Sequence, residues 1–358
     1  MKKINTLLLV ALLQNFVAFS IERGDSTKCS FSCCRPDAVS PAGIMTDHVH
    51  EKGKFAIAYN FMDMAMQSNQ TGTKQISDAT VFNTYMMATN RMNMQMHMLM
   101  PMYGITDRFT VMAMLNYHIN TMSMRMMPMQ SMMNMQGMTV ADYNTMPTNI
   151  KSLGLGDTKI YAMYNLLPAC NHRLAAGLGL SLPTGSIHTR GANRQGNNNV
   201  LPYCMQLGTG TYNLLPSLVY VGQGVRLSWG TALSANIKMG TNANNYSLGN
   251  EYNISPWLAY QFVHWVSVSA RAEYYNVGKL YGYDATINQS SGNDATANVT
   301  NYGSQKVNAY VGVNLYAPAN FLKGGRLLLE YGMPIYQNVN GLQSTVKSTI
   351  TVRLQFNF

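Results

Sequence analysis

Charged residues are scarce in this sequence. Asp, Glu, Lys and Arg make up 11% of the 358 residues, whereas about a quarter is usual in soluble globular domains. The chain also lacks any run of 18 or more apolar residues, which excludes a helical membrane protein. Mean hydropathy is nevertheless close to zero, at −0.09. A typical cytosolic enzyme does not have this combination.

Motifs of the common enzyme classes are missing as well. There is no His-Glu-x-x-His metal motif and no Gly-x-Ser-x-Gly nucleophile elbow. Gly177-Leu-Gly179 is not followed by a helical pattern, and Ser344-Thr-Val-Lys347 lacks the companion motifs of a serine hydrolase. Asp and Glu total only 15, and no spacing indicates a catalytic pair. We therefore predict that the protein is not an enzyme.

The N-terminus has the features of a secretory signal peptide. Lys2 and Lys3 precede a short apolar stretch at residues 7–13, and Ala18 and Ser20 are small residues before a cleavage point. We expect residues 1–20 to be removed on export, which places the five cysteines in an oxidising compartment. Export also argues against nucleic acid as a partner, although the net charge is +10.

The mature chain alternates like β-strands. Between Val266 and Tyr275, for example, apolar residues alternate with Ser, Arg, Glu and Tyr. One face suits lipid and the other suits water, which is the reverse of a soluble sandwich. Segments of membrane-crossing length with this pattern are predicted at 54–66, 91–103, 108–119, 156–167, 172–183, 211–221, 225–238, 250–263, 265–277, 304–316, 325–336 and 345–358.

The connections between these segments alternate between short and long. Short periplasmic turns and long extracellular loops are typical of outer-membrane barrels, and closure removes the sheet edges. We therefore predict an all-β fold, a transmembrane antiparallel β-barrel of about 12 strands (roughly 10 to 14) in the outer membrane of a Gram-negative bacterium. It spans residues 54–358, after a periplasmic leader at residues 21–53. Its expected partners are outer-membrane lipid and, through the terminal Phe358, the barrel assembly machinery.

Methionine is concentrated in one part of the chain, since 24 of the 29 lie between Met45 and Met146. Aromatic and aliphatic residues define the outward phase of the first and third strands, which turns their methionines inward. In the second strand, Asn93, Gln95 and His97 are poor lipid-facing residues, so we predict that the methionines of residues 92–102 face lipid as apolar filler. The predicted luminal wall consists of Met62, Met64, Met66, His97, Met112, Met114 and His118.

This luminal wall has two interpretations. Thioethers beside imidazoles favour Cu(I) or Ag(I), whereas Mg²⁺ or Ca²⁺ would require carboxylates. The alternative is a barrel interior that is packed with methionine and binds no metal. We expect no resident cofactor, and Cu(I) or Ag(I) are the ions that such a wall would take.

A second set of methionines falls in the expected extracellular loop at residues 120–146. Exposing them to water costs hydrophobic free energy, and their Met-x-Met and Met-x-x-Met spacing lets several sulfurs converge on one cation. A metal-capturing loop is one hypothesis; a self-packed lid or a compositional bias are the others. The candidates are Met122, Met124, Met126, Met127, Met129, Met132, Met133, Met135 and Met138.

The leader is a third candidate region. Cys33, Cys34, His48 and His50 offer thiol and imidazole ligands, although their spacing is not that of a zinc finger. The alternative is a plug or strand leader tied by a disulfide.

Several sequence blocks resemble a known family. Residues 41–53, the run Met92-Asn-Met-Gln-Met-His97-Met-Leu-Met-Pro-Met-Tyr103, and residues 154–159, 177–185 and 205–212 are similar to methionine-rich outer-membrane "transporter" barrels related to those of phenol meta-cleavage pathways. The resemblance implies an outer-membrane β-barrel, and the methionine-rich branch is linked to copper handling.

Two functions follow as expectations. In the first, the protein is a channel or receptor that handles soft metal ions through its methionine-rich loop and luminal Met and His residues. In the second, it is a passive channel for small hydrophobic or aromatic solutes, and the methionines are apolar packing.

Overall fold

The structure is a computed structural model that describes residues 35–128, 149–169, 171–193, 196–317 and 324–358. All of these belong to one unit, residues 31–358. The predicted signal peptide and part of the candidate metal set lie outside the described residues, namely Cys33, Cys34, Met129, Met132, Met133, Met135 and Met138. Among the described residues, no helix is both long enough and apolar enough to span a membrane.

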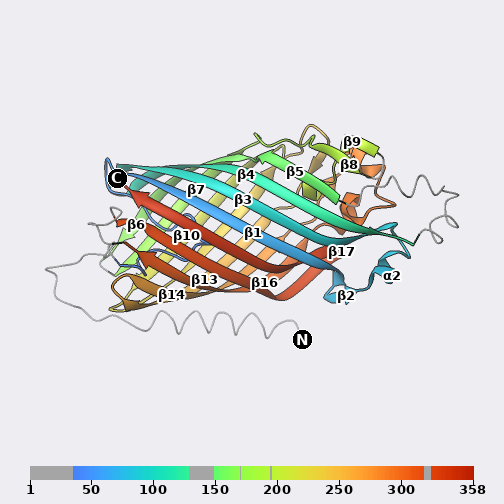
Figure 1. The fold of residues 1–358 in the computed structure, drawn as a ribbon. Coiled ribbons are helices and arrows are strands. Elements are labelled where there is room, and N and C mark those ends of the chain that lie inside the picture. Colours follow the sequence, from blue (N-terminus) through green and yellow to red (C-terminus); the bar gives the residue numbers. More distant parts are fainter. Residues whose placement is uncertain (1–34, 129–148, 170, 194–195, 318–323) are drawn as a thin grey trace, which may run out of the picture. The chain divides into compact units, whose positions relative to one another are not determined.

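Eleven strand elements form a closed antiparallel sheet in the described part of the chain, and β17 pairs with β1 to complete the ring (Figure 1). Each element otherwise pairs with the next one along the chain. The ring consists of β1 (Phe55–Gly72), β3 (Met87–Thr106), β4 (Phe109–Met126), β6 (Thr158–Pro168), β7 (His172–Leu182), β10 (Tyr212–Gln223), β11 (Leu227–Met239), β13 (Glu251–Val263), β14 (Val266–Val277), β16 (Ser304–Tyr316) and β17 (Arg326–Asn357).

The last element, β17, contains two oppositely directed arms. Residues 326–339 pair with β16, and residues 342–357 pair with β1. The chain reverses near Gly341, whose φ of +66° is a left-handed conformation that glycine adopts without strain. With the two arms of β17 counted as separate strands, the number of strands in the ring agrees with the predicted number. The predicted all-β antiparallel barrel is confirmed.

Smaller elements lie at the end of the barrel away from the C-terminus (Figure 1). Among them, β5 extends the barrel wall by pairing with the outer part of β4. These elements are β2 (Lys74–Ile76), α2 (Asp78–Val81), β5 (Asn149–Leu155), β8 (Arg190–Asn193), β9 (Gly196–Val200), η1 (Tyr203–Met205), β12 (Tyr246–Ser247), β15 (Tyr281–Gly282), α5 (Ala285–Asn288), η2 (Ala295–Ala297) and η3 (Val299–Asn301).

The alternation in the sequence places apolar side chains on the outer face and small or polar ones inside. On β14, Val268 and Tyr274 are exposed on the outer face, while Ser267 and Arg271 are buried inside. Aromatic residues surround the end that carries the short turns, as expected at a membrane interface; they include Phe55, Tyr103, Phe262, Trp265 and Phe358. This end is periplasmic, because outer-membrane barrels have their short turns there.

Residues 35–50, which precede β1, lie inside the ring at its periplasmic end. Buried side chains on separate strands of the ring contact them: Ser228 Oγ of β11 donates to Asp37 at 2.6 Å, and Glu330 of β17 accepts from the Gly43 N–H at 2.8 Å. A Cβ atom at Gly43 would collide with the Arg271 guanidinium, so the backbone approaches this wall closely. We call residues 35–50 the plug.

Candidate functional site

Thioethers are the most frequent side chains on one side of the barrel interior. β1, β3 and β4 are adjacent, and directly paired residues of neighbouring strands share a face. Met62 pairs with Met96, and Met96 with His118. We call the inward methionines of these strands the methionine wall. It consists of Met62, Met64, Met66, Met92, Met94, Met96, Met98, Met100, Met102, Met112, Met114, Met122, Met124 and Met126.

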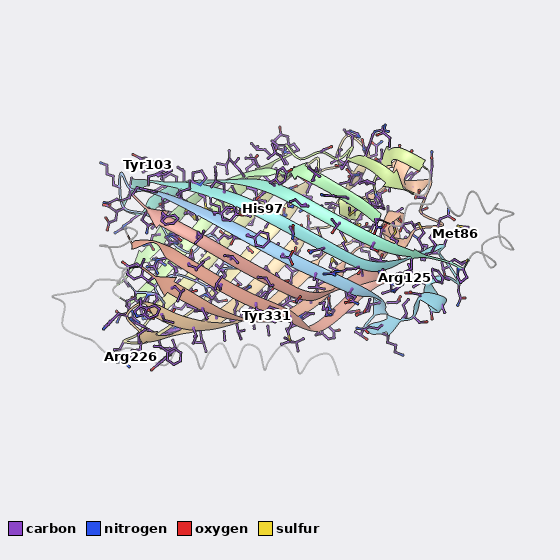
Figure 2. The ribbon with its side chains drawn as sticks, in the orientation of Figure 1. Met86, His97, Tyr103, Arg125, Arg226 and Tyr331 are labelled. Carbon is purple, nitrogen blue, oxygen red and sulfur yellow. The ribbon has the colours of Figure 1, made fainter. Side chains whose placement is uncertain are left out.

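The prediction for β3 was wrong: its methionines face the lumen. Met98, Met100 and Met102 are at most 4% exposed, whereas Leu99 and Tyr103 are 40% and 47% exposed. The reason lies in the pairing, because each methionine of β3 is opposite an inward residue of β1. Tyr103 lies near the periplasmic end of β3, and Met86 precedes its outer end (Figure 2).

His97 therefore points outward and does not belong to the luminal wall. Its Nδ1 is 2.6 Å from the Tyr59 hydroxyl, and its ring lies 5.1 Å from that of Phe61. Beside it, Gln95 donates to Asp63 at 3.0 Å. These polar groups are tolerated on the outer face because they pair with one another or with an aromatic hydroxyl. Asn, Gln and His are therefore poor indicators of the inward face in this strand.

The four described methionines at residues 122–127 also differ from the prediction. Met122, Met124 and Met126 belong to β4, which is longer than predicted, and Met127 is only 3% exposed. They do not face water. With Met86, Met87, Met92 and Met205 they form an apolar cluster at the outer end of the barrel, against which Cys204 packs. No sequence pattern indicates that Met86, Met87, Cys204 and Met205 meet there.

A second apolar cluster lies below the first, towards the plug. Met98, Met100, Met112 and Met114 are buried in it together with Met163 of β6. Met45 and Val49 of the plug pack against this cluster. In contrast, Met62, Met64, Met66, Met94 and Met96 are only half-buried. The accessible part of the methionine wall therefore lies above the plug.

The opposite side of the interior is polar and paired. We call the inward side chains of β11, β13, β14, β16 and β17 the polar wall. At its centre, Arg271 binds Glu330 through two contacts of 2.8 and 3.2 Å. Glu273 accepts from Tyr310, Asn308 and Asn253 at 2.6–2.9 Å. Higher up, Lys238 contacts Glu251 at 2.8 Å.

The plug histidines lie together but bind protein groups. The rings of His48 and His50 are 4.8 Å apart, and His48 contacts Asp47 at 2.7 Å and Gln355 at 3.0 Å. Burial lowers the pKa of His50 to about 3. Burial would raise the pKa of the Asp47 carboxyl, but His48, Arg353 and Arg173 together hold it well below its usual range. Neutral His50 and ionised Asp47 are thus the forms that the plug favours.

The described residues contain no group of three or more His, Cys, Asp and Glu side chains that could hold a metal ion. His118 is brought beside Met96, whereas His48 and His50 are at the plug and His97 is outside. The metal-binding role of the methionines, of His118 and of the leader residues stays a prediction.

Comparisons with known proteins bear on the fold. No family model and no curated protein matches this chain. It is similar to the crystal structure of an outer-membrane channel from Pseudomonas putida, with a TM-score of 0.58 and 15% identity over 89% of this chain and 100% of the other. A FadL homologue from Pseudomonas aeruginosa has a TM-score of 0.43 and 10% identity, covering 85% of this chain and 90% of its own.

A mutant of TodX, a monoaromatic hydrocarbon channel, has a TM-score of 0.44 and 11% identity, covering 90% of this chain and 94% of its own. The likeness to the Pseudomonas putida structure establishes the fold. Together with the closed ring and its apolar outer face, it identifies this protein as a β-barrel of the Gram-negative outer membrane.

Proposed function

We propose that the protein is an outer-membrane channel for small hydrophobic or aromatic solutes, with the methionine wall as its apolar lining. The observation that carries this proposal is the inward direction of the methionines on three adjacent strands. Thioether side chains are flexible and polarisable, and they contact aromatic rings favourably. A lining of this kind accepts apolar solutes of varied shape.

The exposure of the wall supports the proposal. Met62, Met64, Met94 and Met96 are half-buried, so part of their apolar surface is accessible from the lumen. Covering such surface with a solute contributes roughly 25 cal/mol per Å². The plug fills the periplasmic end, so passage in this proposal includes a shift of residues 35–50.

Dye entry into whole cells tests the proposal. N-phenyl-1-naphthylamine is an apolar aromatic dye that an intact outer membrane excludes and that fluoresces in lipid. Cells that express the barrel should take it up several-fold faster than cells that express an unrelated barrel of equal abundance. Sensitivity to vancomycin should stay unchanged, because a damaged membrane would admit both compounds. Equal dye entry in both strains would refute the proposal.

Soft-metal handling is the second candidate. The specific observation in its favour is the packing of Cys204 against a cluster that contains Met122, Met124, Met127 and Met205, since sulfur ligands select Cu(I) and Ag(I). Titration of the detergent-folded protein with Ag⁺ tests this candidate. Soft-metal handling requires that the protein bind Ag⁺ tightly and that the double variant Cys204→Ser, Met205→Leu lose this binding. Ag⁺ affinity no higher than that of a methionine-poor barrel would eliminate this candidate.

A further inference from the structure

The interior of the barrel carries more positive than negative side chains. Cations face inward from β6, β7, β11, β14, β16 and β17, whereas the inward anions of these strands and β13 are three glutamates. The cations are Lys159, Arg173, Lys238, Arg271, Lys306, Arg326 and Arg353, and the anions are Glu251, Glu273 and Glu330. Charges of one sign in a low-dielectric cleft attract ligands of the opposite sign.

The three glutamates are already occupied by protein groups. Glu330 is bound by Arg271 and by the Gly43 N–H, and Glu273 accepts from Tyr310. Glu251 is bound by Lys238 and accepts from the Tyr275 hydroxyl at 2.7 Å. Their negative charge is therefore largely compensated within the wall.

Lys159 is different from these paired groups. Among the described residues, no hydrogen bond or ion pair involves its ammonium, and the same holds for Lys306. Lys159 lies on the inward face of β6 and is half-buried. Nearby Asp157 is occupied, because its carboxylate accepts from Thr209 and from the Gly185 N–H.

Lys159 also adjoins the methionine wall. It pairs directly with Met114 of β4. His118 lies four residues further along β4 on the same inward face, beside Met96. The His118 ring lies against the backbone of Gly156, three residues before Lys159. Met62 continues the apolar surface on β1. A cation and an imidazole thus border an accessible thioether surface.

We propose that this border is a binding subsite for amphipathic organic anions. A carboxylate or sulfonate head group binds Lys159 and His118, and an aromatic or aliphatic body lies on the half-buried Met62 and Met96. The inference rests on the proposed channel function and narrows its solute class. Charge-assisted hydrogen bonds to the head group supply orientation, and the thioethers supply apolar contact.

Calorimetry with three probes tests the subsite on the full chain in a maltoside detergent. Benzenesulfonate carries both the charge and the apolar body, methanesulfonate lacks the body, and benzyl alcohol lacks the charge. Benzenesulfonate should bind at least tenfold more tightly than either of the other two. Equal binding of benzenesulfonate and benzyl alcohol would overturn the proposal, because the charge would then contribute nothing.

Two matched variants locate the subsite. Lys159→Gln should weaken benzenesulfonate binding about tenfold, which is the value of one charge-assisted hydrogen bond. Lys306→Gln removes the same charge from the other side of the ring and should change binding less than twofold. Equal losses in both variants would overturn the subsite in favour of a diffuse charge effect. Heat-modifiable electrophoretic mobility confirms that each variant is folded.

The dye-entry assay keeps the two proposals distinguishable. N-phenyl-1-naphthylamine is neutral at physiological pH, so its entry does not depend on Lys159. Loss of benzenesulfonate selectivity with normal dye entry would refute only the subsite. Absence of dye entry would refute the channel function, whatever the binding data.

Discussion

The methionine wall and the polar wall line the same lumen but are stabilised differently. The methionine wall is held by apolar packing among flexible side chains on β1, β3 and β4. The polar wall is held by directional contacts, of which the paired bonds between Arg271 and Glu330 are the clearest. Packing of this kind tolerates changes of shape, whereas a buried ion pair tolerates the loss of neither partner. The walls should therefore respond differently to substitution.

The largest expected effect is in the polar wall. Arg271→Leu leaves Glu330, which is 3% exposed, without its cation. We expect a loss of about 3–5 kcal/mol in the free energy of unfolding, measured by urea titration in detergent micelles. Replacing Glu330 with Gln in the same chain should recover part of that loss. A cost below 1 kcal/mol, roughly the size of an exposed pair, would contradict the assignment of this pair as buried.

Truncation in the methionine wall should have the next largest effect. Met98→Ala removes a side chain that is 1% exposed, and the cavity should cost roughly 2–5 kcal/mol. Met98→Leu conserves volume and should cost less than about 1.5 kcal/mol. The same urea titration measures both. If the leucine variant were as unstable as the alanine variant, the wall would depend on sulfur and not on packing.

Acid should loosen the plug. Burial lowers the pKa of His50 in the docked plug to about 3, from an ordinary value of 6.5. His50 therefore binds a proton more readily when the plug is displaced. Plug docking is therefore fully stable above about pH 6.5 and weakens as the pH falls from there towards 3. Hydrogen exchange of residues 35–50, corrected for its intrinsic pH dependence, should accelerate by up to about tenfold per pH unit in this window.

A control variant sharpens the pH prediction. His50→Gln removes the titrating ring, so the acceleration between pH 6.5 and about 4 should largely disappear. Below that range Asp47 also becomes protonated when the plug is displaced, which loosens the plug further. An unchanged pH profile in the variant would show that His50 does not control docking.

The outer face of β3 should give the smallest effect. His97→Leu removes the outer-face contacts with Tyr59 and Phe61 and should change the free energy of unfolding by less than about 1 kcal/mol. Dye entry should remain at the wild-type rate. A variant that folds but no longer admits the dye would place His97 in the lumen, contrary to the structure.

The sequence predicts most of this fold because strand alternation and loop length carry the signal. The bounds of β13, for example, are Glu251–Val263 against a predicted 250–263. Prediction from the sequence fails where strand pairing overrides local composition. The register between β1 and β3 turns Met98 inward and His97 outward. The prediction also underestimates the length of β4, which continues to Met126, because the Met-x-Met spacing of residues 122–126 fits a metal-binding loop as well as a strand.

The candidate site is only partly visible in the sequence. Met112, Met114 and His118 are predicted inward and are found there. Cys204 and Met205 lie far along the chain from Met122, and only the packing of the outer segments brings them together. Likewise, the pairing of Lys159 with Met114 depends on sheet register. Contacts between residues that are far apart in the chain produce no local pattern in the sequence.

Replacement of the accessible methionines distinguishes an apolar channel lining from one that depends on sulfur. We would change Met62, Met64, Met94 and Met96 together to leucine and measure the entry of N-phenyl-1-naphthylamine into cells. An apolar lining requires hydrophobic surface and not sulfur, so entry should stay within about twofold of the wild-type rate. Abolished entry by a barrel that is still folded and abundant in the outer membrane would contradict the account.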